Sequence, residues 1–96
     1  MLFRSHEWEA EFQLNGIKMS ANYSDTGIWL ETEMAISATE LPQIVSTSIK
    51  KKYIGWQITH AYKIETAHKG LLYEADIKSG MKKKEVLFQE DGTFIK

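Results

Sequence analysis

Three histidines are the side chains of this sequence best suited to bind a transition metal. A zinc site needs three or four converging ligands, and a helix supplies two of them when histidines stand four residues apart. His6, His60 and His68 lack this spacing, and the one stretch with helical periodicity contains no histidine. The sequence has no cysteine, which excludes disulfides and thiol catalysis and leaves the redox compartment open. We therefore expect neither a metal ion nor a cofactor.

A second candidate for chemistry is Asp25-Thr26-Gly27, the triplet of retroviral-type aspartic proteases, in which two such aspartates, one per subunit, share a proton. In those enzymes buried apolar residues precede the triplet and a small residue follows it, whereas here Tyr23-Ser24 and Ile28-Trp29 flank it. The related segment Glu90-Asp91-Gly92 indicates that both triplets are hairpin turns. The protease is a remote alternative, and we expect that the chain is not an enzyme.

Half of the 12 basic residues stand in two runs, Lys50 to Lys52 and Lys82 to Lys84. Such runs can contact phosphate in nucleic acids or lipids, but 13 acidic residues and a net charge of −1 leave no overall attraction to either. A solvated helix end and a charged strand that discourages aggregation account for the lysines. No apolar run approaches the ~20 residues of a membrane span, and residues 1–4 are too short for a signal peptide. We expect no nucleic-acid partner and no membrane insertion.

Alternating apolar residues predict antiparallel strands before and after a single helix. Trp8, Ala10, Phe12 and Leu14 alternate with polar residues, and Asn15-Gly16, the strongest short hairpin signal, follows them. The same pattern along the chain predicts a meander of three strands, then the helix, then four strands of which the last is short. The strands are expected at residues 8–14, 17–23, 28–36, 56–67, 71–78, 82–90 and just after residue 92.

The helix is expected at residues 40–53, where one face is formed by Leu41, Ile44, Val45, Ser48, Ile49 and Tyr53. Its start is marked either by Ser37 with Glu40 three residues later, as a capping box, or by Thr39 alone, with Pro42 tolerated in the first turn. Three lysines favour the negative end of the helix dipole, and Gly55 supplies a stop signal.

The strands and turns on either side of the helix repeat 65 residues apart. Trp8-Glu9-Ala10-Glu11-Phe12 aligns without a gap on Tyr73-Glu74-Ala75-Asp76-Ile77. Tyr23-Ser24-Asp25-Thr26-Gly27-Ile28-Trp29-Leu30 aligns on Phe88-Gln89-Glu90-Asp91-Gly92-Thr93-Phe94-Ile95 in the same way. A repeat of this length is one supersecondary unit that shares a core with its neighbour. We expect one domain, residues 1–96, in which the repeats 8–31 and 73–96 lie around helix 40–53.

The order of these segments resembles the PepSY-like family, also called β-lactamase-inhibitor-like. The resemblance rests on the repeated segments, on Glu40-Leu41-Pro42 at the helix start and on Leu87-Phe88-Gln89-Glu90-Asp91-Gly92. It implies an α+β fold, an antiparallel sheet of two repeated β-meanders with about seven strands and one helix packed on one face. It also implies a non-enzymatic binding module of the periplasm or the secreted space, with no catalytic residue to transfer.

One departure from that family concerns the first meander. A complete pair of modules would place a helix before it, and only seven residues precede Trp8, so the first helix of the tandem repeat is absent. The face built by Trp8, Phe12, Ile17, Met19 and Tyr23 is then expected to remain uncovered. An exposed apolar face of this size indicates a partner, a homodimer or a trimmed chain.

A second candidate surface is the sheet face opposite the helix. Alternation places Trp29, Leu72, Leu87 and Phe94 there, provided that no bulge shifts the register. Exposed aromatics are enriched at binding hot spots, so this strip predicts binding of a protein or peptide. The competing interpretation is that Trp29 and Phe94 only pack the ends of the two meanders. The predicted function is binding through the sheet face; the alternative is an assembly role, by homodimerisation through the uncovered meander.

Overall fold

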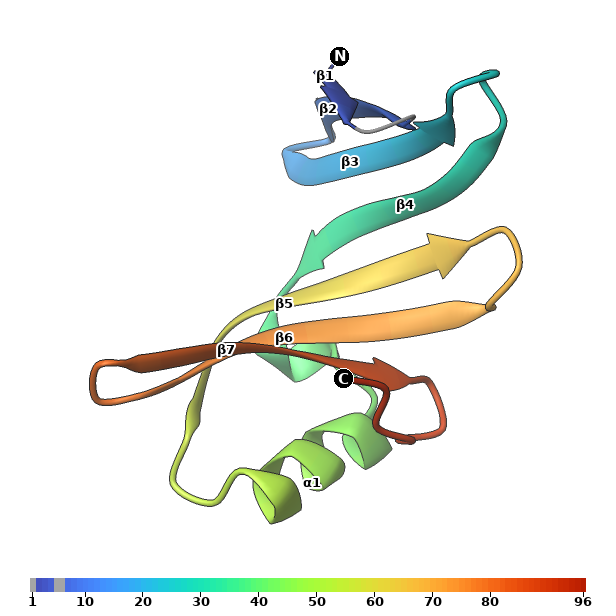
Figure 1. Ribbon diagram of the computed structural model, residues 1–96. Helices are drawn as coiled ribbons and strands as arrows, with labels where there is room; N and C mark the ends of the chain where they lie inside the picture. Colours follow the sequence, from blue (N-terminus) through green and yellow to red (C-terminus); the bar gives the residue numbers. More distant parts are fainter. Residues whose placement is uncertain (1, 5–6) are drawn as a thin grey trace.

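The computed structural model describes residues 2–4 and 7–96 of the chain. Its seven strands form one antiparallel sheet in which spatial order follows chain order (Figure 1). A short 3₁₀ helix, η1 (Ala38–Glu40), and the α-helix α1 (Gln43–Lys52) lie in the connection between the fourth and fifth strands. The strands are β1 (Leu2–Arg4), β2 (Glu7–Leu14), β3 (Ile17–Ser24), β4 (Trp29–Ile36), β5 (Gln57–Thr66), β6 (Leu71–Ser79) and β7 (Lys82–Gln89).

The predicted α+β fold with one covering helix is confirmed, and two strands differ from the prediction. β1 was not predicted and pairs with the start of β2. The short last strand that was expected after residue 92 is only a single bridge, between Phe88 and Phe94. Residues 93–96 nevertheless run along β7, because the amide of Gln89 donates to the Thr93 carbonyl and the Leu87 backbone bonds with Ile95 and Lys96.

The β2–β3 hairpin has the turn that its sequence predicts. Asn15 and Gly16 both have positive φ, 52° and 79°. These are the values of the two-residue turn that matches the twist of adjacent strands, and asparagine followed by glycine adopts it at least cost. The turn therefore fixes the register that puts Leu14 opposite Ile17 and the apolar residues of both strands on one face.

The helix starts later than predicted, at Gln43 rather than at residue 40. The Ser37 amide donates to Glu40 Oε1 at 2.9 Å, so the predicted contact forms, but it closes η1. Leu41 is then extended, with ψ at 139°, because the ring of Pro42 disfavours helical conformation in the residue before it. At the other end Lys50, Lys51 and Lys52 occupy the last turn as predicted, and Gly55 follows with φ at 83°.

The core lies between α1 and the C-terminal half of the sheet. Val45 and Ile49 are the buried residues of α1, and Leu41 continues their stripe toward the N-terminus. Each such side chain stabilises the fold by about 1.5–3 kcal/mol through removal of apolar surface from water. The three contact buried residues of β5, β6 and β7: Ala61, Tyr73, Ala75, Ile77, Val86 and Phe88. In Figure 1, α1 lies below β5–β7 and away from β1–β3.

The sequence repeat is also a repeat of strand pairing. Trp8 pairs with Tyr23, Ala10 with Ala21 and Phe12 with Met19 in the N-terminal hairpin. The partners 65 residues later pair in the same register: Tyr73 with Phe88, Ala75 with Val86 and Ile77 with Lys84. The two hairpins are therefore equivalent position by position, although α1 covers only the second.

The N-terminal hairpin leaves its apolar face exposed, as predicted. Trp8, Phe12 and Ile17 are each about two-fifths exposed, while Met19 and Tyr23 are half-buried by their neighbours in the sheet. We call this surface, together with Trp29, the open face. It lies on the same side of the sheet as α1, because directly paired residues connect it to the core: Phe12 pairs with Met19, Met19 with Met34, Met34 with Lys63, and Lys63 with Tyr73.

Candidate functional site

The four residues predicted to form a strip opposite α1 do not lie on one face. Leu72 and Leu87 are opposite α1, because they alternate with the core residues Tyr73 and Phe88. Leu72 is only 5% exposed, so it belongs to the packing of the sheet and is not a free surface. The prediction that Trp29 and Phe94 lie on this face was wrong, because they pair with Tyr23 and Phe88, which lie on the α1 side.

A bulge between β3 and β4 changes the side of Trp29. The register shifts at Asn22 and Tyr23, so that Trp29 pairs with Tyr23, which lies on the α1 side. The indole Nε1–H of Trp29 donates to Thr32 Oγ1 at 2.8 Å, on that same side. One inserted residue exchanges the two faces of a strand. The predicted strip depended on the absence of such a bulge.

Phe94, the equivalent of Trp29 in the second repeat, also lies on the α1 side. Its ring packs edge-on against Phe88 with centroids 5.5 Å apart, and the Lys52 ammonium of α1 lies 4.4 Å from its centroid. Phe94 therefore packs the end of its meander against the helix, which is the competing interpretation for this residue.

The face opposite α1 is a trough lined by acidic side chains. It has a volume of about 690 Å³ and extends across β2 to β7. Seven carboxylates and a single lysine line it, with Tyr62, Ile64 and Ala35 at its centre. The carboxylates are those of Glu9, Glu11, Glu31, Glu33, Glu74, Asp76 and Glu85.

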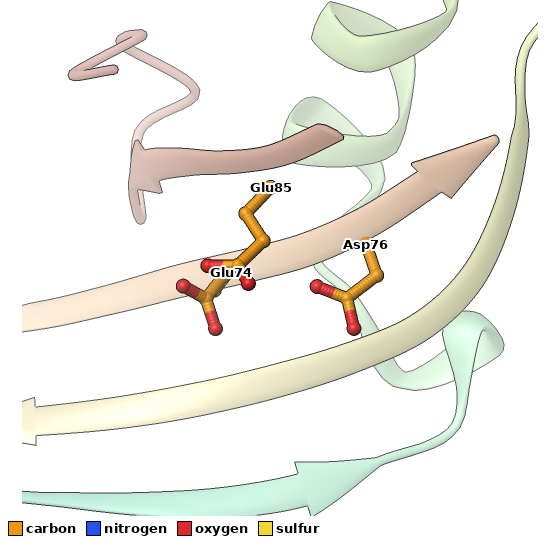
Figure 2. Close-up of side chains that lie close together, drawn as sticks. All are labelled: Glu74, Asp76 and Glu85. Atoms are coloured by element: carbon orange, nitrogen blue, oxygen red, sulfur yellow. The ribbon is translucent and has the colours of Figure 1, made fainter. Parts of the chain in front are cut away.

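Three of these carboxylates converge, with oxygens within 4.8 Å of one another, as Figure 2 shows for Glu74, Asp76 and Glu85. The strand pairing explains this, because Glu74 and Asp76 are two residues apart on β6 and Glu85 lies opposite Asp76 on β7. Carboxylate oxygens suit a hard cation such as Ca²⁺. Three carboxylates on a solvated sheet face do not by themselves define a metal site.

Glu74 is the most perturbed group in the trough. Burial raises its pKa from the ordinary 4.5 to about 8, and a hydrogen bond with the Glu33 side chain and the negative charges of Glu33, Glu85 and Asp76 act in the same direction. At neutral pH the protonated Glu74 carboxyl thus donates to Glu33, which removes one negative charge from a crowded site. Burial, then the charges of Glu33 and Glu7, also raise the pKa of Glu31.

Two other polar side chains lie on the trough side of the sheet, His60 beside Asp76 and Tyr62 in the lining. Nδ1 of His60 lies 3.6 Å from Oδ2 of Asp76 and 3.2 Å from Oγ1 of Thr59. Burial and then the charge of Asp76 raise the pKa of Tyr62. The phenol therefore remains protonated and available as a hydrogen-bond donor in the middle of the face.

Sequence reasoning missed the trough, although a signal for it was present. Acidic residues alternate at two-residue spacing in three strands: Glu9 with Glu11, Glu31 with Glu33, and Glu74 with Asp76. Period two puts each pair on one face. The antiparallel register then collects the pairs on the face opposite α1, which no single strand reveals.

Asp25 lies in the exposed turn between β3 and β4, where the Gly27 amide donates to the Ser24 carbonyl at 2.9 Å. The Gly92 amide donates to the Gln89 carbonyl at the same distance in the repeat. The hairpin-turn interpretation of both triplets is therefore confirmed. Of the histidines, His60 and His68 are exposed and on different elements, and His6 lies outside the described residues.

The comparison that decides the family covers almost the whole chain. The family description "Putative beta-lactamase-inhibitor-like, PepSY-like" matches residues 6–96. The chain belongs to the PepSY-like family. The resemblance predicted from the repeated segments is thus confirmed, and no curated protein matches the chain.

Solved structures share the PepSY-like fold at low sequence identity. A BLIP-like protein from Bacteroides fragilis is 20% identical with a TM-score of 0.81, over 99% of this chain and 69% of that one. A protein from Bacteroides eggerthii described as a "putative periplasmic" protein is 13% identical with a TM-score of 0.85, over 95% and 68%. A DUF2874 family protein from Bacteroides uniformis is 16% identical with a TM-score of 0.85, over 95% and 69%. These neighbours support the fold of the PepSY-like chain and carry no residue-level role.

Within residues 2–4 and 7–96, no helix combines the length and apolar character needed to cross a membrane.

Proposed function

We propose that this PepSY-like chain is a non-enzymatic binding module that holds a basic segment of a protein or peptide in the trough. The observation that carries the proposal is the charge of that surface, seven carboxylates against one lysine on a hollowed sheet face. Complementary charge steers association and selects partners more than it adds raw affinity. A cationic segment would also offset the negative charges of Glu33, Glu85 and Asp76, which add to burial and the Glu33 hydrogen bond in raising the pKa of Glu74.

The dimensions of the trough suit a polypeptide. It crosses six strands, and strands lie about 4.8 Å apart, so its length is on the order of 24 Å. An extended segment of about seven residues, at about 3.3 Å each, spans this length. The half-buried Tyr62 gives such a segment an aromatic contact and a hydroxyl donor at the centre, between acidic edges.

We place this module in the cell envelope or the secreted space. The support is the family resemblance together with the B. eggerthii neighbour, which is described as periplasmic.

The experiment is calorimetric titration with a synthetic lysine-rich nonapeptide as the probe. Glu11→Lys combined with Glu85→Lys reverses two exposed charges of the trough and should weaken binding about tenfold or more. The matched control, Glu65→Lys with Glu90→Lys, makes the same charge change at exposed residues outside the trough and should bind like the wild type. Binding should also weaken as salt is raised. Equal affinities of the two double variants would refute the trough as the site.

A second candidate function, assembly with another polypeptide, is favoured by the open face. Phe12 and Ile17 are exposed at the turn end of the hairpin, and Trp8 is exposed on the same face four residues along β2 from Phe12. Contiguous apolar surface of this kind marks interaction sites in stable monomeric folds. Homodimerisation is one form of such assembly, and Trp29 is the residue of the predicted binding strip that we assign to this surface.

A further inference from the structure

A second hollow adjoins the trough on the side of the β6–β7 turn. It has a volume of about 670 Å³ and shares Asp76 and Glu85 with the trough, so the two hollows are continuous. Lys78 follows Asp76 by two residues on β6, and Lys83 precedes Glu85 by two residues on β7. Period two therefore puts both lysines on the face opposite α1. The acidic surface ends in this basic pair.

Lys78 and Lys83 face each other directly across two strands. They are paired residues of β6 and β7. Like charges at directly opposite positions repel each other and destabilise a sheet. Among residues 2–4 and 7–96, neither lysine has an ion-pair partner. The carboxylates of Asp76 and Glu85 converge with that of Glu74 instead, as Figure 2 shows. The pair thus holds two positive charges that the described chain does not balance.

The internal repeat shows that the fold does not require two lysines at these positions. The equivalent residues of the N-terminal hairpin are Gln13 and Lys18, which pair in the same register and carry one charge. Protection against aggregation accounts for lysines on the edge strand β7, but not for Lys78, because β6 is an inner strand. A second cation at this position indicates an anionic ligand.

We propose that Lys78 and Lys83 bind the C-terminal carboxylate of the basic segment that occupies the trough. This inference rests on the proposed function and gives the bound segment an end and a direction. A carboxylate has two oxygens, so each ammonium can donate a charge-assisted hydrogen bond to one of them. Capture of a terminal carboxylate is a recurring mode of peptide recognition.

The neighbouring acidic residues determine which anion is accepted. Asp76 and Glu85 border both hollows, so a phosphate with about two negative charges would be repelled by two carboxylates. A terminal carboxylate has a single charge and belongs to a segment whose lysine or arginine can pair with Asp76 or Glu85. Two residues cover about 7 Å along a strand and along an extended segment alike. We therefore expect a basic side chain about two residues before the carboxyl terminus.

The position of the lysine pair favours a chain end over an acidic side chain. β6 ends at Ser79 and β7 begins at Lys82, so the turn replaces the sheet directly beyond the pair. A segment that continued past the lysines would leave the sheet surface. A side-chain carboxylate would also have to lose rotamer freedom on binding, which costs conformational entropy.

The test compares two forms of one lysine-rich nonapeptide by calorimetric titration at low salt, one with a free C-terminal carboxylate and one with a C-terminal amide. The wild type should bind the free acid at least about threefold more tightly, although the amide is the more cationic peptide. Lys78→Gln combined with Lys83→Gln should abolish this preference. The matched control, Lys50→Gln with Lys51→Gln, removes the same charge from α1 and should retain it. All four lysines are exposed, so the substitutions leave the core intact.

A third peptide, amidated and extended by one glutamate, carries the charge of the free acid in a side chain and should bind the wild type more weakly than the free acid. Equal affinity for these two peptides would overturn the assignment to a chain end. Equal binding of the free acid and the amide by the wild type, or a preference that persists without Lys78 and Lys83, overturns the inference and leaves the trough as the site. Failure of every peptide to bind overturns the proposed function as well.

Discussion

At the scale of single residues, the trough shows how crowding changes the chemistry of a carboxyl. Glu74 is half-buried, has Glu33 as its hydrogen-bond partner, and lies among the negative charges of Glu33, Glu85 and Asp76. The folded protein therefore retains a proton that an exposed glutamate releases near pH 4.5. A surface with this property is suited to binding a positively charged ligand.

The free energy of unfolding should decrease as pH rises from about 5 to about 8. In this range Glu74 is protonated in the folded protein and ionised in the unfolded chain, because its folded pKa is raised from 4.5 to about 8. The stabilising contribution is complete below the unfolded pKa and is lost as pH passes through the folded one. Urea unfolding at several pH values measures it. Glu74→Gln should flatten the dependence, and the same dependence in this variant as in the wild type would contradict the assignment; Glu90→Gln, at an exposed position, serves as the control.

At the scale of elements, the sequence predicted what depends on local periodicity. The hairpin at Asn15-Gly16, the helix with its basic last turn and the uncovered apolar face all follow from residues close together in the chain. The helix starts at Gln43 because the ring of Pro42 clashes with a helical backbone at Leu41. Hydrophobic periodicity gives no signal of this clash. The bulge between β3 and β4 places Trp29 on the other face. Prediction of the trough would have required the register of six strands. Both depend on pairing between strands, which a single strand does not encode.

Equivalent positions of the two hairpins should respond differently to truncation. Ile77→Ala removes a fully buried side chain beneath α1 and should reduce the free energy of unfolding by about 2–5 kcal/mol. Phe12→Ala removes a larger side chain from the open face and should cost no more than about half as much, because water already reaches two-fifths of that residue. Chemical denaturation of both variants provides the comparison. A cost for Phe12→Ala equal to that for Ile77→Ala would mean that the open face is covered in solution.

At the scale of the whole molecule, one continuous sheet has two unequal halves. The buried core consists of α1, β5, β6 and β7, with Leu41 before the helix. β2 and β3 contribute two buried residues, Glu9 and Ala21. The N-terminal half is therefore held mainly by strand pairing, and the C-terminal half also by a packed core.

Hydrogen exchange should report this asymmetry. Paired backbone amides of β6 should exchange at least about tenfold more slowly than those of β2, because local opening of β2 exposes little apolar surface. Residue-resolved exchange measured by NMR tests this. Equal protection of β2 and β6 in the isolated chain would contradict the description of two unequal halves.

The C-terminal residues have a consequence for aggregation. An open strand edge can template the addition of strands from other molecules. Residues 93–96 occupy the outer hydrogen-bonding groups of β7 at Leu87 and Gln89, and the remaining part of that edge carries Lys82, Lys83 and Lys84. A foreign strand arriving there meets either an occupied backbone or three positive charges. This border of the sheet is thereby closed to fibril growth, and removal of the last four residues would open it.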